Sequence, residues 1–201
     1  MTEKEVTEVN TLYFGFDESN HAEKDKKKGE IVVALFSTDQ DDSIVREWPN
    51  VRRNSDFERW IHHPGHDYRF TILTGEEYKY RSSAANLTEA AQTLVTSVLT
   101  EPTSPFSPEI PLNVDSIKIY FDGGGFRKDR KDLLRNYFKD LGLTDVVVDN
   151  FIKKNKNNRG KMRKGPRCPR LVYLADILAH PLGGLSGMEL LSHPKFAPHI
   201  F

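Results

Sequence analysis

Three aspartates stand within or at the end of segments that otherwise have the composition of a protein core. Asp17 and Asp122 each follow a short run of apolar, strand-forming residues, and Asp176 interrupts the apolar segment 171–179. A buried carboxylate is costly unless a positive charge shares its site. A cluster of carboxylates becomes favourable around Mg²⁺ or Mn²⁺, which are hard cations that take oxygen ligands. These three residues are therefore the first candidates for chemistry.

Two glutamates are candidates for a fourth acid at such a site. Glu89 lies near the start of a helix predicted over 86–99, where it could bind metal or could form a capping box with Asn86. Glu18 follows Asp17 directly. It faces away from Asp17 if the strand continues, and toward the same site only if the chain turns there.

The segment around Asp176 is predicted to be a helix, and the helix allows two positions for this acid. Its neighbours Leu174 and Leu178 favour a place among apolar residues at the site, whereas helical periodicity also permits an exposed position. His180 lies one turn later and could move protons at the same site. A histidine near a helix C-terminus is also explained by its favourable interaction with the helix dipole.

The segment 153–170 is strongly basic and contains no acid. Its cations are Lys153, Lys154, Lys156, Arg159, Lys161, Arg163, Lys164, Arg167 and Arg170. Intervening asparagine, glycine and proline residues predict a loop without regular structure. Such loops are commonly solvated surface features, but this one directly precedes the helix of Asp176, where it could neutralise nucleic-acid phosphates. Because it lacks aromatic residues, base stacking is not predicted.

Eight elements must position these residues. Strands are expected at 11–17, 30–36, 68–73, 116–122 and 144–149, and helices at 86–99, 129–141 and 171–179. The first two strands should be antiparallel because they are joined by a short hairpin, and the last two parallel because a helix separates them. Gly142 is expected to end the second helix, and Pro181 with the following glycines the third.

The length of 201 residues suits one α/β domain over 1–201, with 1–10 as a polar lead-in. Acidic and basic residues balance at 29 each, so net charge indicates no partner. The single cysteine, Cys168, cannot form an intramolecular disulfide, and no apolar segment has the length of a signal peptide or membrane span. We therefore expect a cytoplasmic protein.

The element order β-β-β-α-β-α-β-α, with acids on the first and fourth strands and on the last helix, resembles the ribonuclease H-like superfamily. The resemblance runs from about Leu12 to His180. The stretch Asp17-Glu-Ser, together with the late Leu174-Ala-Asp helix, also resembles a poorly characterised branch of that superfamily. Members of that branch carry Asp-Glu-Ser-Gly, and Asn20 stands here in place of the glycine.

The resemblance implies a five-stranded mixed sheet in which strands one and four are parallel neighbours. Asp17 and Asp122 would then lie about 5 Å apart, the usual strand spacing. Asp176 and Glu89 would complete a site for two Mg²⁺ or Mn²⁺ ions about 4 Å apart, which hydrolyses phosphodiester bonds of RNA or DNA.

Other classes fit less well or remain open. A non-catalytic nucleic-acid- or protein-binding module on the same fold is the open alternative. An actin-like kinase would need two such domains and phosphate-binding glycine loops, for which this chain is too short. A phosphatase with an aspartyl nucleophile would need Asp-x-Asp after the first strand, where this chain has Asp17-Glu18.

Overall fold

The computed structural model describes residues 10–19, 29–38, 66–73, 83–100, 114–122, 126–151 and 170–197. The elements are β1 (Thr11–Ser19), β2 (Glu30–Ser37), β3 (His66–Leu73), α4 (Ser83–Thr100), β4 (Ser116–Asp122), α5 (Lys128–Asp140), β5 (Asp145–Phe151), α6 (Arg170–Gly184) and α7 (Gly187–Leu191). The predicted order of five strands and three helices is confirmed, and the short α7 is an addition to it.

The five strands form one mixed sheet with the order β3-β2-β1-β4-β5. β2 pairs antiparallel with both β1 and β3, whereas β4 pairs parallel with both β1 and β5. The antiparallel hairpin, the parallel last pair and the parallel neighbours β1 and β4 are thus all as expected. β1 lies at the centre of the sheet.

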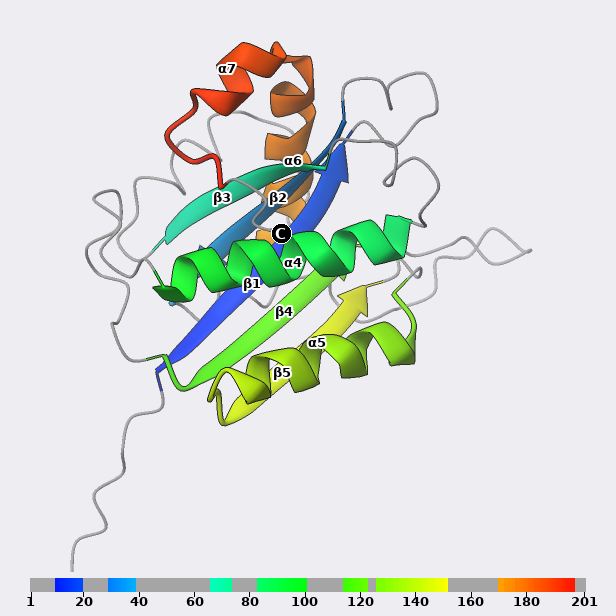
Figure 1. The fold of residues 1–201 in the computed structure, drawn as a ribbon, viewed down its shortest axis with the longest axis vertical. Coiled ribbons are helices and arrows are strands. Elements are labelled where there is room, and N and C mark those ends of the chain that lie inside the picture. Colours follow the sequence, from blue (N-terminus) through cyan, green and yellow to red (C-terminus); the bar gives the residue numbers. More distant parts are fainter. Residues whose placement is uncertain are drawn as a thin grey trace, which may run out of the picture.

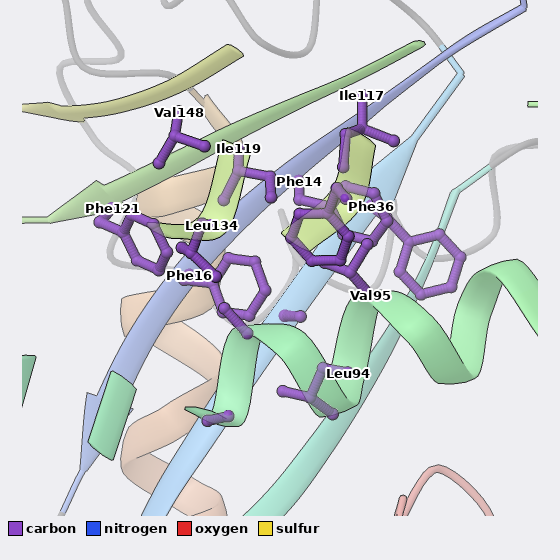
Figure 2. Packing of buried hydrophobic residues seen from close by; sticks show 14 of the residues in the cluster. Phe14, Phe16, Phe36, Leu94, Val95, Ile117, Ile119, Phe121, Leu134 and Val148 are labelled. Carbon is purple, nitrogen blue, oxygen red and sulfur yellow. The ribbon is translucent and has the colours of Figure 1, made fainter. Parts of the chain in front are cut away.

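Helices cover both faces of the sheet: α4 and α5 lie on one face and α6 on the other (Figure 1). Side chains alternate along β1, so Leu12, Phe14 and Phe16 point toward α4 and α5 while Tyr13 belongs to the cluster under α6. In Figure 2 the rings of Phe14, Phe16 and Phe36 gather over Leu94 and Val95 of α4. The two clusters give the sheet a core on each side.

Gly15 allows α6 to approach β1 at backbone distance. A β-carbon at position 15 would overlap the backbone carbonyl carbon of Leu171 and would lie 2.5 Å from the backbone nitrogen of Val172. A glycine inside a strand often marks such a close approach of another backbone. The start of α6 is therefore fixed against the middle of β1.

Several predicted boundaries were wrong: β3 begins two residues early at His66, β5 ends two residues late at Phe151, and three others affect the candidate residues. α4 begins at Ser83, so Asn86 lies inside the helix and cannot cap it. β1 continues to Ser19 because its last residues pair with the start of β2. α6 continues through Pro181 to Gly184, and buried Leu182 holds this last turn against the core. Gly142, with a φ of 98°, follows α5 as predicted.

The segment after α7 covers the outer edge of β3. The Phe70 N–H donates to the Lys195 carbonyl over 3.1 Å, and the Ala197 N–H donates to the Phe70 carbonyl over 2.8 Å. The Lys195 ammonium forms an ion pair with Asp67, whose side chain is 1 % exposed. Burial lowers the pKa of Lys195, and the Asp67 carboxylate opposes that lowering. This clasp of backbone bonds and one ion pair shields an edge strand from unwanted pairing.

We predict that Gly15→Ala lowers the free energy of unfolding by about 3 kcal/mol or more, since overpacking of a tight core typically costs 1–3 kcal/mol and here the obstacle is backbone. The matched control is Gly184→Ala, because a β-carbon there meets nothing within 4 Å. Chemical denaturation measures both. Equal stabilities of the two variants would contradict the close packing of α6 on β1.

We also predict that Lys195→Met lowers the free energy of unfolding by about 3 kcal/mol, because it leaves the Asp67 carboxylate buried without its main counter-charge. The double variant Asp67→Asn, Lys195→Met should recover most of that loss, since the buried carboxylate is removed together with its partner. Denaturation at pH 7 distinguishes the two variants. A double variant as unstable as the single one would show that packing, and not charge, dominates the clasp.

Candidate functional site

The first and fourth strands bring two of the predicted acids to the same end of the sheet. In the parallel register Phe16 pairs with Phe121, and Asp17 and Asp122 are the next residues of the two strands. Neighbouring strands lie about 4.8 Å apart. The backbone positions of these acids are therefore adjacent at the carboxyl ends of the two central parallel strands, a common place for ligand sites in open α/β sheets.

Asp17 is held firmly at this place. Asp17 is only 7 % exposed. Its Oδ1 accepts a hydrogen bond from the Glu18 N–H over 2.9 Å. On the opposite face, the rings of Phe16 and Phe121 lie 5.1 Å apart and fix the lateral register of β1 and β4. The acid is thus placed by a rigid core and not by a loop.

α6 packs on the same face as Asp17. Alternation along β1 puts Asp17 on the side of Gly15, where α6 makes its close approach. Asp176 and His180 lie one turn apart on this helix, and both are exposed. The apolar neighbours of Asp176 are buried because they form the inner face of α6, so their presence in sequence does not imply burial of the acid between them.

The two glutamates lie on the other face of the sheet. β1 continues as a strand through Glu18, which therefore points away from Asp17. Glu89 is partly exposed in the second turn of α4, which packs against the face opposite to α6. Either glutamate can reach Asp17 only around the end of the strands.

The capping box considered for Glu89 does not form, because α4 begins at Ser83 and Asn86 lies inside the helix. The Asn86 Nδ2 donates to Glu30 Oε2 over 2.9 Å, which ties α4 to the start of β2. The other oxygen of Glu30 is buried and accepts no hydrogen bond in the described structure. Sequence reasoning missed Glu30, although an acid that opens an apolar strand, directly after Gly29, is a detectable signal.

Two aspartates at neighbouring backbone positions of adjacent strands are residue types suited to a hard divalent cation, because such an ion neutralises charges that otherwise repel. The side chain of Asp122 lies outside the described residues. Among the side chains that are described, no group of three or more histidine, cysteine or acidic residues could hold a metal ion. What favours Mg²⁺ or Mn²⁺ here is the residue type at positions 17 and 122, since both are carboxylic acids and these ions prefer oxygen ligands.

The predicted basic loop lies outside the described residues, except that Arg170 begins α6. Within the described ranges, no helix has the length and apolar character needed to cross a membrane. No known protein family matches this chain, and no curated protein matches it in sequence.

We predict that Asp17→Asn raises the stability of the metal-free protein by about 1 kcal/mol, because relief of like-charge repulsion amounts to roughly one pKa unit. Mg²⁺ should raise the melting temperature of the original protein more than that of the variant, since binding stabilises the native state by mass action.

Asp115→Asn is the control for this comparison. Asp115 is exposed and lies at the opposite end of β4. It should leave both the metal-free stability and the Mg²⁺-induced shift unchanged. An identical Mg²⁺ shift in the original protein and in Asp17→Asn would remove Asp17 from any metal site.

Proposed function

We propose that this protein is a divalent-metal-dependent nuclease with a ribonuclease H-like fold, which hydrolyses phosphodiester bonds of RNA or DNA. The observation that carries the proposal is the parallel register of β1 and β4, which makes Asp17 and Asp122 neighbours at one end of the sheet. The strand order and the helices on both faces support the fold assignment.

In this proposal Asp17, Asp122 and Asp176 hold Mg²⁺ or Mn²⁺, with Glu89 as a fourth acid. Such ions polarise a phosphodiester and lower the pKa of bound water. The chain itself supplies rigidity: the buried carboxylate of Asp17 is oriented by the Glu18 N–H and shielded from bulk water. A carboxylate that is already fixed in its orientation needs little reorganisation during a reaction.

α6 and the basic loop complete the proposed site. The contact at Gly15 sets the distance of α6 from β1, and thereby the position of Asp176. His180, one turn along the same exposed face, can hold or release a proton beside it. The cations of 153–170 directly precede this helix, so they can bind phosphates of a substrate next to the site.

The alternative is a non-catalytic nucleic-acid- or protein-binding module on the same fold. The exposed position of Asp176 favours it, because an exposed acid needs no metal for its stability. Under this alternative the two strand-end acids are structural, and nucleic acid or protein binds without being changed.

The test uses labelled single-stranded, double-stranded and hybrid oligonucleotides, each with Mg²⁺, Mn²⁺ or a chelator. We expect cleavage of at least one substrate with metal and none with chelator. Asp17→Asn and Asp122→Asn should each reduce the rate by more than about a hundredfold, since outer-shell residues of metal sites alone are worth ten- to hundredfold. Asp115→Asn should cleave normally. Cleavage that survives chelation, or binding without cleavage, would reject the nuclease.

The same assay separates the weaker members of the site. Asp176→Asn should abolish cleavage if this acid binds metal, and should leave it unchanged if it is only a surface residue. If Glu89 is a metal ligand, Glu89→Gln should lower turnover strongly. A rate within a few-fold of the original would exclude Glu89 and make Glu18 the next candidate.

A further inference from the structure

Three cations gather at the start of α5. Arg127 and Lys128 are exposed and Arg130 is partly exposed. Within the part of the chain that the structure describes, none of the three forms an ion pair. Lys131 beside them does, because it binds Asp149 of β5 over 2.7 Å. We call Arg127, Lys128 and Arg130 the cationic patch.

The cationic patch is unfavourable for the isolated fold. Residues three or four apart on a helix are neighbours, so Arg127 and Arg130 repel each other. Cations at a helix N-terminus also oppose the helix dipole, and the first turn contains a single acid, Asp129. Arg127 occupies the N-cap position without a side-chain cap. An anionic partner would relieve each of these costs.

The position of the cationic patch relates it to the strand-end acids. β4 ends at Asp122 and α5 begins at Lys128, so the patch lies at the same end of the sheet as Asp17 (Figure 1). The buried Phe126 anchors this junction, since its ring stacks on that of Phe121 with centroids 4.2 Å apart. The patch is therefore held at a fixed place at this end of the sheet, on the side covered by α4 and α5, from which a bound strand reaches Asp17 around the ends of β1 and β4.

We propose that the cationic patch binds the phosphate backbone of a nucleic-acid strand that leads into the site of Asp17 and Asp122. This inference rests on the proposed function for its substrate class. Arginine guanidinium groups bind phosphate oxygens in a forked geometry, and lysine adds a point charge. The contact would be independent of base sequence, because phosphates carry no sequence information directly.

The test measures binding without cleavage, by fluorescence anisotropy of a labelled single-stranded oligonucleotide in chelator over a range of NaCl concentrations. We expect the triple variant Arg127→Ala, Lys128→Ala, Arg130→Ala to bind roughly tenfold more weakly. Its slope of log affinity against log salt should fall by about 2, since each single-strand phosphate contact contributes about 0.7.

Lys128→Ala and Lys139→Ala form a matched pair, because both lysines are exposed and lie at opposite ends of α5. Only Lys128→Ala should weaken binding. It should not lower the melting temperature, since it removes a cation from the N-terminus of the helix, whereas Lys139→Ala removes a favourable one from the last turn. If the triple variant loses binding but keeps its melting temperature, the loss is therefore due to missing contacts between the patch and the oligonucleotide and not to unfolding.

The outcomes separate the patch from the nuclease. If the original protein and the triple variant had the same oligonucleotide affinity and the same salt slope, the proposed role of the patch would be wrong. It would also be wrong if Lys139→Ala weakened binding as much as Lys128→Ala. If the triple variant bound phosphatidylglycerol vesicles more weakly than the original protein but bound the oligonucleotide equally well, the patch would be a membrane-binding surface and the proposal would be wrong. Loss of oligonucleotide binding in the triple variant supports the patch, even if the original protein cleaves nothing in Mg²⁺, a result that would overturn the nuclease alone.

Discussion

The contact of α6 with β1 is the constraint on which the rest of the arrangement depends. Gly15 leaves no side chain between the strand and the backbone of Leu171, so the helix lies directly on the central strand. This approach closes the apolar cluster on that face and sets where Asp176 and His180 stand relative to Asp17. The glycine in the middle of this aromatic-rich strand thus determines how closely α6 packs on the sheet.

The sheet divides the acids of the candidate site into two groups. Asp17 and position 122 share the face covered by α6, whereas Glu18 and Glu89 belong to the face covered by α4. Alternation along a strand makes this division unavoidable, since neighbours in sequence point to opposite sides. A site that uses acids from both faces must lie at the end of the strands, where the sheet no longer separates them.

Charge is distributed unevenly although the chain is neutral overall. At the covered edge of β3, the buried charges of Lys195 and Asp67 form an ion pair. On α5, Lys131 and Arg135 also have acidic partners, but among the described residues the three cations of the cationic patch do not. Pairing elsewhere makes this unpaired cluster, at the same end of the sheet as the acids, the more informative feature for binding.

The sequence by itself determined the five strands, the three main helices and two of the acid positions, because local alternation, helical periodicity and Gly142 are short-range signals. It misplaced the start of α4 and the end of α6. Asn86 bonds Glu30 in the first of these regions and Leu182 packs in the core in the second, and these contacts join residues far apart in the chain. Only the tertiary structure decided that Asp176 is exposed, that the glutamates face away from Asp17, and that Gly15 admits α6. Each depends on which face of an element is covered, and that is settled by packing between elements.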